Sequence, residues 1–529
     1  MNADLRLRKL TFFPPLIVLG FFVVLGITNE EGFLGIVGAI NNWIIANVGW
    51  AASFLALSVV IVAFAAMFSK FGDVRLGGAD AKPELSTFSW VSIAMITTMA
   101  AGVLFWGPAE PIAHIMAPPT ELVGIYPQTP EATRFAMETM FMHWTIIPYA
   151  IYTVPAVVFG FMYYNAKRPF SITSEMAPAL GKHADRPNVI KVIDALTLFS
   201  IGAGMAGSVA QGFLSIAGGL SHTLGIESGA TTWLVIAIVL GAVVAFSAIS
   251  GIKKGLRTLS NINVVGFALF LLFLLTFSNI PFLLNLATES LGGFIGNFFE
   301  RALLTGAAAE SQWPQWWTTF YWFSWMAWAP TSGAFMGRIA YGRKVKHILA
   351  MYIGLCASLS AFWMIVVSGT SIWTHTSGAA DLIAAYESGI ANVAFNILGT
   401  MPLGGIVSII FVFLVALSLV TACDSNTIAM AGISTSGISP DKPDAPRWIK
   451  LIWAFIVMGL GFVMIATIGE NGVRVIANFG GMVAAIIMIG ATVSMVMLIK
   501  NYKKYDKTLE QVPVAKKAEE NSVGETISP

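Results

Sequence analysis

The stretch FYWFSWMAWAP, residues Phe320–Pro330, places three tryptophans, one tyrosine and two phenylalanines side by side. It lies within an apolar run about as long as a helix needs to cross a hydrocarbon core. Tryptophan and tyrosine normally gather where lipid meets water rather than at this depth. On a helix, Tyr321, Trp325 and Trp328 share one face. An aromatic face inside a membrane span indicates either packing between helices or a site for an organic cation.

The whole chain has the composition of a polytopic membrane protein. It has 529 residues, of which 56% are hydrophobic and 11% charged, and a mean hydropathy of +0.76. A soluble protein carries roughly 25% charged residues. The two cysteines, Cys356 and Cys423, lie in apolar runs, which excludes a disulfide framework and a cysteine metal motif. The N-terminal sequence reads directly into the first apolar run without the pattern of a cleavable signal.

Twelve apolar runs are long enough to cross a bilayer as helices. Because these runs are continuous rather than alternating, they exclude a β-barrel and predict an all-α integral membrane protein. The predicted spans cover residues 12–29, 48–69, 88–107, 139–164, 192–220, 231–250, 262–280, 316–337, 347–369, 403–429, 448–468 and 475–499.

Positive charge is distributed unevenly between the loops. With a cytoplasmic N-terminus, all but three of the 30 Lys and Arg residues fall on the cytoplasmic side, the exceptions being Arg134, Arg301 and Arg474. We therefore expect both termini in the cytoplasm. Residues 281–315 have apolar positions at helical spacing, which predicts either an interfacial helix or an ordinary helix of an outer loop. The charged tail, residues 501–529, is expected to be flexible.

Two predicted spans carry the same short signature of Trp, a small residue and Pro. It occurs at residues 106–108 in the third span and at residues 328–330 in the eighth. Transporters often bind substrate where membrane helices break at matching points of two repeats. The signature therefore predicts breaks in spans 3 and 8, which open two blocks of five helices, spans 3–7 and 8–12.

A second aromatic group lies in the fourth predicted span, HWTIIPYAIY, residues 143–152. Trp144, Tyr149 and Tyr152 add ring faces to those of Trp325. A quaternary ammonium or sulfonium group gains about 0.5–2 kcal/mol from each favourable face. Packing between helices is the alternative interpretation of these rings. We expect His143, beside them, to be a packed and hydrogen-bonded residue.

Several stretches together resemble the betaine/choline/carnitine transporter family. They are FFPPL (12–16), STFSW (86–90), VLFWGPAEP (103–111), HWTIIPYAIY (143–152), SGIKKGLRTLSNIN (250–263), FYWFSWMAWAP with GRIAYGRKVK (320–346) and TACDSNT (421–427). They follow the family's order across almost the whole chain. The resemblance implies a LeuT-like core of two inverted five-helix repeats, preceded by two extra helices, in a homotrimer in the cytoplasmic membrane.

The implied organisation divides the chain into six parts. They are a cytoplasmic N-terminus (1–11), two peripheral helices (12–87), the first repeat (88–280), an outer amphipathic segment (281–315), the second repeat (316–500) and a cytoplasmic tail (501–529).

The resemblance also implies a binding site. Carried over by position, the family's central cage implies Trp144, Tyr149, Tyr152 and Trp325 around a trimethylammonium-like group. Trp328 resembles the ring that meets substrate on its way in or out. At Ser324 this chain departs from the further Trp found in many members, which leaves the exact substrate open.

The third span would face the substrate as well. The implied residues are Thr98, Met99, Ala100, Ala101 and Gly102. Choline carriers of the family tend to have an Asp in this stretch, whereas this chain has no acid between Thr97 and Trp106. A zwitterion that supplies its own carboxylate is therefore favoured over choline. Free backbone N–H groups at a helix break would receive that carboxylate.

The sequence indicates the coupling ion less directly than it indicates the substrate. In sodium-coupled relatives an ion lies near the backbone of Met99 and two hydroxyls of the tenth span. Here Thr421 supplies one hydroxyl, but Ala422 replaces the usual Ser. Sodium-independent exchangers have an Arg where this chain has Asn263. Asp424 is either a cation or proton site or an acid hydrogen-bonded within its span. These features together favour sodium symport.

The sequence thus predicts a secondary transporter that imports a betaine-type zwitterion, such as glycine betaine or dimethylsulfoniopropionate, by alternating access. The alternatives are a sodium-independent carnitine or betaine exchanger and a proton-coupled carrier of the choline type. An integral-membrane enzyme lacks a catalytic cluster, and a channel lacks a repeated pore motif. We expect no cofactor other than a coupling ion, and no nucleic-acid partner. No phosphate-binding GxxxxGK[ST] motif is present, which argues against direct coupling to ATP.

Overall fold

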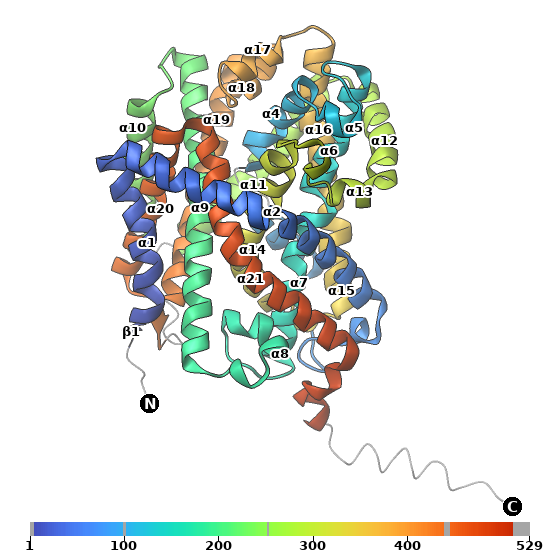
Figure 1. Cartoon of the computed structure of the whole chain (residues 1–529), viewed down its shortest axis with the longest axis vertical. Coiled ribbons are helices and arrows are strands. Elements are labelled where there is room, and N and C mark those ends of the chain that lie inside the picture. Colours follow the sequence, from blue (N-terminus) through green and yellow to red (C-terminus); the bar gives the residue numbers. More distant parts are fainter. Residues whose placement is uncertain (1–4, 99–101, 251–252, 438–444, 512–529) are drawn as a thin grey trace, which may run out of the picture.

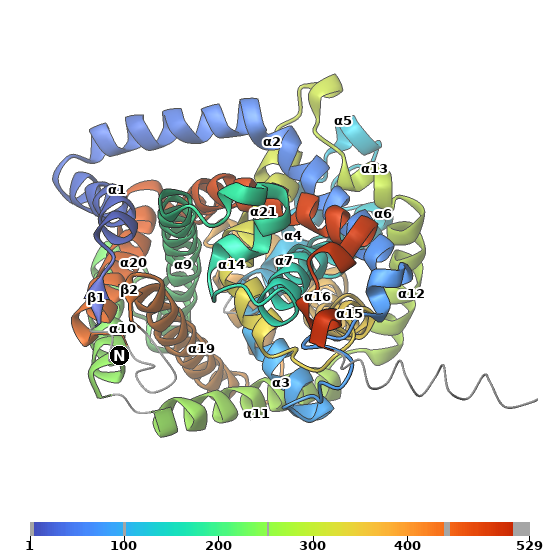
Figure 2. The same ribbon diagram turned by 90° about the horizontal axis from the view of Figure 1, so that it is seen from below.

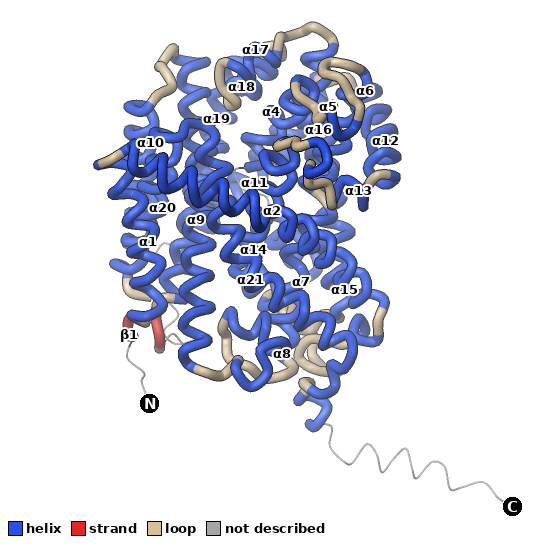
Figure 3. Tube along the Cα trace, viewed as in Figure 1, coloured by secondary structure: helices blue, strands red, loops and turns tan. Residues whose placement is uncertain are grey.

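The protein is mostly helical. The computed structural model describes residues 5–98, 102–250, 253–437 and 445–511 (Figure 1, Figure 3). The helices are α1 (Lys9–Thr28), α2 (Glu30–Phe68), α3 (Thr87–Thr98), α4 (Gly102–Met116), α5 (Thr120–Val123), α6 (Pro130–Trp144), α7 (Ile146–Tyr164), α8 (Ala177–Leu180), α9 (Pro187–Leu224), α10 (Ala230–Ser250), α11 (Lys253–Phe277), α12 (Ile280–Gly296), α13 (Phe298–Ala302), α14 (Phe320–Arg338), α15 (Val345–Leu349), α16 (Ala357–Thr376), α17 (Leu382–Glu387), α18 (Asn392–Gly399), α19 (Gly404–Ile433), α20 (Arg447–Ile468) and α21 (Gly472–Asn501). Two short strands, β1 (Arg6–Leu7) and β2 (Thr435–Ser436), pair in antiparallel fashion.

Several of these helices are built to cross a membrane. In the described residues, eight helical segments are long and apolar enough to do so, or nine if α11 and α12 form one bent span. Helices lie over each of the twelve predicted spans. The prediction of an all-α membrane protein is therefore confirmed. Twelve crossings and two inverted repeats remain predictions.

The second helix is much longer than expected. The sequence predicted a span beginning at residue 48, but α2 begins at Glu30, directly after α1. Asn29 caps its first turn by accepting a hydrogen bond from the Gly32 N–H at 2.9 Å. The helix is longer than the predicted span because the residues before 48 are themselves apolar and continue it. Seen from below, α1 and α2 lie along one edge of the molecule (Figure 2).

Of the two predicted helix breaks, the one in the eighth span is absent from the structure. The eighth span was expected to break near Pro330, yet α14 is continuous through that proline. A proline removes one backbone hydrogen bond, and packing of α14 against α7 and α21 holds the helix together here. The fourth span breaks instead, because Thr145 has φ −118° and ψ −110° between α6 and α7. The break expected in the third span falls on residues 99–101, outside the described residues.

The segment expected along the outer interface is helical. α12 turns by 103° from the last part of α11. The next short helix, α13, is tied to α6 by an ion pair of 2.6 Å between the Arg301 Nη2 and Glu138 Oε2 atoms. Glu138 is buried, and Arg134 forms a second ion pair with it at 3.1 Å. The position of α12 along a membrane surface remains a prediction.

The C-terminal tail was expected to be flexible from residue 501, which is wrong for its first part. The Lys507 N–H donates to the Asn165 carbonyl at 3.1 Å. The Asn165 amide donates to Asp506 at 3.2 Å, and Asp506 is buried. This stretch therefore docks on the loop after α7. Residues 512–529 lie outside the described residues, and β1 lies at the same end of the molecule as the C-terminal end of α21 (Figure 1).

α14 occupies the middle of the structure. It packs between α7 and α21, and it also contacts α9. The crossing with α21 is close, since a Cβ added to Gly481 would overlap backbone atoms of Phe323. The Ser200 hydroxyl of α9 lies 3.0 Å from the Ala327 carbonyl and 2.8 Å from the Gly480 carbonyl. These contacts fix the rotation of α14 and so decide where its aromatic side chains point.

Candidate functional site

An aromatic cavity lies where α4, α6, α7, α14 and α16 meet. Its free volume is small, about 10 Å³, which is about the space that one water molecule needs. The lining residues are Val103, Trp144, Pro148, Tyr149, Tyr152, Trp325 and Ser360. All four aromatic residues that the resemblance implied for a cage therefore surround one cavity. Their role in binding remains a proposal.

The aromatic rings of the cavity meet edge to face and are not stacked on one another. The Trp144 and Trp325 rings have centroids 5.3 Å apart and planes at 90°. The Tyr152 and Trp325 rings are 5.7 Å apart at 83°. Trp144, Tyr149 and Tyr152 are buried, whereas Trp325 is partly exposed. Ring faces on more than one side of a cavity are the arrangement that favours a rounded onium group.

Two prolines explain how α16 is attached to this site. The helical partner of the Trp144 carbonyl would be the N–H of Pro148, which proline lacks. The Ser360 hydroxyl of α16 donates to that carbonyl instead, at 2.7 Å. The same replacement occurs in α4, where Pro111 leaves the Gly107 carbonyl without a donor. Ser368, also of α16, donates to it at 2.7 Å.

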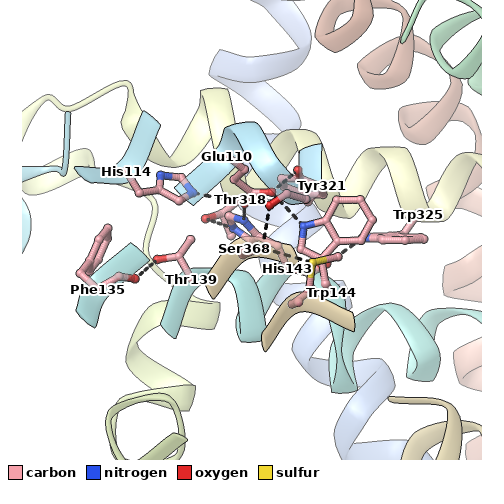
Figure 4. Close-up of polar contacts among 12 residues, drawn as sticks. Glu110, His114, Phe135, Thr139, His143, Trp144, Thr318, Tyr321, Trp325 and Ser368 are labelled. Carbon is pink, nitrogen blue, oxygen red and sulfur yellow. Dashed lines mark hydrogen bonds and ion pairs between the residues drawn. The ribbon is translucent and has the colours of Figure 1, made fainter. Parts of the chain in front are cut away.

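Behind the cavity lies a polar cluster centred on Glu110 of α4 (Figure 4). Its Oε1 atom is 2.6 Å from His143 Nδ1 and 3.2 Å from His114 Nε2. Its Oε2 atom accepts hydrogen bonds from the Trp144 indole N–H at 2.8 Å and from the Tyr321 hydroxyl. We call Glu110, His114, His143, Trp144 and Tyr321 the Glu110 cluster. Each of these side chains is buried.

The cluster reaches Trp325 through the backbone. The Trp325 indole N–H donates to the His143 carbonyl at 3.0 Å. The His143 ring stacks on Tyr321, with centroids 4.5 Å apart, and its Nε2 atom lies 3.2 Å from the Thr318 hydroxyl. His143 is thus hydrogen-bonded and packed, as the sequence predicted. Both cavity indoles are bonded to parts of this cluster.

Glu110, His114 and His143 are also the described residues best placed to hold a metal ion. One ligand atom from each lies within 4.8 Å of the others. Carboxylate and imidazole groups suit zinc and related ions. However, the distances between these groups are those of hydrogen bonds. The His114 Nδ1 atom has no partner in the described part of the chain, although a metal-bound histidine usually has one.

Other predicted substrate residues lie apart from the cavity or at its edge. Trp328 packs against α9, with its Nε1 atom 3.1 Å from a Cβ built on Gly204. Ser324 is partly exposed and does not line the cavity. A Cβ on Gly102 would lie 3.7 Å from the Trp144 ring, so Gly102 borders the cage. Thr98 ends α3, and nothing is described of its side chain.

Met99, Ala100 and Ala101 lie outside the described residues. Of the two residues predicted to flank the ion position, Met99 and Thr421, the structure therefore describes only Thr421. The Thr421 hydroxyl donates to the Leu417 carbonyl at 2.7 Å. Asp424 is fully buried on α19, in an environment that includes Ser247 of α10 and Lys450 of α20.

The sequence interpretation missed Glu110 and Ser360. Glu110 was visible as an acid within the apolar motif VLFWGPAEP, a position that favours a functional role in a membrane span. Ser360 carries no such signal, because a serine in a span usually bonds to its own helix. Tyr321 was expected on the face of Trp325, but its hydroxyl points to Glu110.

Comparison with known proteins places this geometry in a family. The family model "BCCT, betaine/carnitine/choline family transporter" matches residues 10–505. The chain belongs to this family. It is therefore a multi-pass membrane transporter of a small molecule and not an enzyme.

Relatives within the betaine/carnitine/choline transporter family are similar over most of their length. A probable glycine betaine transporter of Desulfitobacterium hafniense is 27% identical over 474 residues, covering 90% of this chain and 93% of the relative. Glycine betaine transporter 1 of Vibrio parahaemolyticus is 29% identical and covers 87% of each chain. An ectoine/hydroxyectoine transporter of Virgibacillus pantothenticus is 25% identical, covering 96% of this chain and all of the relative.

Proposed function

We propose that this protein imports a betaine-type zwitterion, a quaternary ammonium or sulfonium compound such as glycine betaine or dimethylsulfoniopropionate. The observation that carries the proposal is the cavity whose walls are Trp144, Tyr149, Tyr152 and Trp325. A methylated onium group has no N–H to donate, so it gains from ring faces what it loses in hydration. The names of the glycine betaine transporters among the relatives support the same class.

The charge around the cavity favours a zwitterion. Among the described residues that line it, none carries a carboxylate. Glu110 lies behind the wall, and all four of its contacts are to cluster side chains rather than to the cavity. A substrate with its own carboxylate needs no acid from the protein. Gly102, the first residue of α4 that the structure describes, borders the cage. A break of the third span before it, as expected from the sequence, would offer free N–H groups to that carboxylate.

The proposed mechanism is alternating access in a LeuT-like fold of twelve helices, with inverted repeats at residues 88–280 and 316–500. We propose a homotrimer in the cytoplasmic membrane, with both termini in the cytoplasm, that accumulates its substrate as a compatible solute. Sodium is the proposed coupling ion, with Thr421 as one ligand. Asp424 is the second candidate for ion binding.

Uptake into proteoliposomes tests substrate and coupling together. Purified protein is reconstituted, and entry of radiolabelled glycine betaine is measured with an inward sodium gradient, with a proton gradient, or with internal substrate alone. Sodium symport predicts accumulation only with the sodium gradient. Accumulation with the proton gradient, or exchange that ignores sodium, would refute sodium coupling.

Competition identifies the substrate class in the same vesicles. Unlabelled dimethylsulfoniopropionate, carnitine, choline and ectoine are added in turn. The proposal expects the betaine-type zwitterions to compete better than choline. If choline competes best, the assignment of a zwitterion is wrong.

A further inference from the structure

Glu110 is the most completely bonded buried acid among the described residues, and the proposed transport function does not by itself explain it. Its four contacts come from three different helices. His114 belongs to α4 itself, His143 and Trp144 come from α6, and Tyr321 comes from α14. Figure 4 shows these side chains converging on one carboxylate. Burial of a carboxylate is unfavourable unless all of its hydrogen bonds form, so the members of the cluster depend on one another.

The orientation of Trp144 depends directly on this acid. An indole N–H can only donate a hydrogen bond. The Trp144 N–H donates to Glu110 Oε2 at 2.8 Å, which fixes the plane of the ring that forms one wall of the cavity. The ring also meets the edge of Tyr321, with centroids 5.3 Å apart. Without the carboxylate, this N–H would be buried without an acceptor.

The orientation of Trp325 depends on the same acid indirectly, through His143. Its N–H donates to the His143 carbonyl, and the His143 ring is bonded to Glu110 Oε1. Movement of His143 would therefore turn the second indole as well. One carboxylate thus controls the angle between the two perpendicular walls.

The bond to Trp144 also has an electronic effect. An acceptor at an indole N–H shifts electron density toward the ring, because hydrogen bonds in a chain polarise one another. Attraction of a cation to the ring face follows that density. A carboxylate acceptor, being charged, gives a stronger effect than a neutral carbonyl.

We propose that Glu110 is a positioning residue for the onium cage: it holds the planes of Trp144 and Trp325 and enriches the Trp144 face that meets the cation. The inference rests on the proposed function of the cavity. It assigns Glu110 no contact with substrate. Its effect passes through the Trp144 N–H and through His143.

A double-mutant cycle tests this route. Glycine betaine affinity is measured by equilibrium binding of the radiolabelled compound to wild type, Glu110→Gln, Trp144→Phe and the double variant. Each single change is expected to weaken binding about ten-fold. The loss in the double variant is expected to be smaller than the product of the two single losses, because phenylalanine has no N–H through which Glu110 can act and only the route through His143 remains. In uptake, KM should rise more than kcat falls.

Matched controls separate this effect from general damage. Trp453→Phe removes an indole N–H that donates to Ser434 at 3.0 Å, away from the cavity. Glu131→Gln neutralises an exposed acid in the first turn of α6. Both controls are expected to bind like wild type. If Glu110→Gln is not recovered as folded protein, Glu110→Asp replaces it, since the shorter side chain draws the carboxylate away from Trp144.

Three outcomes would overturn the proposal. Additive losses in the double variant would show that Glu110 does not act through Trp144. Unchanged affinity in folded Glu110→Gln would show that it does not act on the cage at all. Stoichiometric zinc in the purified protein, with binding lost on chelation, would make the cluster a metal site instead. A wild-type protein that binds no onium compound would refute the proposed function itself, which is a separate result.

Discussion

Removal of the Trp325 ring is the sharpest perturbation of the cage. In Trp325→Ala the cation loses one of its desolvated ring faces, worth about 2 kcal/mol. At 1.4 kcal/mol for each ten-fold change, the dissociation constant for glycine betaine should rise about thirty-fold. In Trp325→Phe a weaker face remains, and a loss of about 1 kcal/mol predicts a rise of about five-fold.

The same change also weakens the fold. Trp325 makes ring contacts with Trp144 and Tyr152, at 5.3 and 5.7 Å. Aromatic pairs of this kind contribute about 0.5–1.5 kcal/mol each beyond the burial of the rings, so the free energy of unfolding should fall by at least about 1–3 kcal/mol. The loss of affinity must therefore be measured on protein that elutes as a single folded species.

The assay is equilibrium binding of radiolabelled glycine betaine to purified variants. Trp316→Ala is the control, because Trp316 precedes the same helix but is 58% exposed. It should bind like wild type. The order wild type, Trp325→Phe, Trp325→Ala is expected for affinity. A folded Trp325→Ala protein with wild-type affinity would refute the reasoning that the ring faces bind the cation.

Three further predictions concern the scaffold. Ser360→Ala leaves the buried Trp144 carbonyl without its donor, so thermal unfolding should show a loss of about 1–3 kcal/mol, and an unchanged transition would contradict that bond. Gly481→Ala places a methyl group against the backbone of Phe323 and should cost about 1–3 kcal/mol, whereas an equally stable variant would show that the two helices separate easily. Burial raises the pKa of the Glu175 carboxyl well above its usual range, and the backbone of Ala334 offsets this only in part. The folded state then holds a proton that the unfolded chain releases, so stability should fall as pH rises above about 4.5, the ordinary pKa of a glutamate. In unfolding scans, Glu175→Gln should flatten this dependence of stability on pH. An equal slope in both proteins would exclude Glu175 as its source.

The four cage residues were implied by the family resemblance, and they come from two short stretches of sequence. Tyr149 and Tyr152 lie one turn apart on α7, and Trp144 lies just before the break at Thr145. Helical periodicity grouped Tyr321, Trp325 and Trp328 on one face, but of these three only Trp325 lines the cavity. The rotation of α14 is set by α9 and α21, which pack against it from distant parts of the chain, and this turns Trp328 toward Gly204.

The Glu110 cluster could not be predicted in the same way. Glu110 is separated from His143 by 33 residues and from Tyr321 by 211 residues. A local pattern shows that an acid lies in an apolar run, but not which donors meet it. The continuous α14 was missed for a related reason. The sequence shows that Pro330 removes a hydrogen bond, but not that neighbouring helices hold the chain straight.

The hydroxyl bonds from α16 have a consequence for how this family can vary. Pro148 leaves the Trp144 carbonyl without its helical N–H donor, and the Ser360 hydroxyl donates in its place. Pro111 likewise leaves the Gly107 carbonyl to the Ser368 hydroxyl. A homologue that restores an ordinary residue at either proline no longer requires the matching serine. A homologue that loses the serine while keeping the proline leaves a buried carbonyl oxygen without a hydrogen-bond donor. Substitutions at each of these two positions should therefore be inherited as compensating pairs, which an alignment of many family members would reveal.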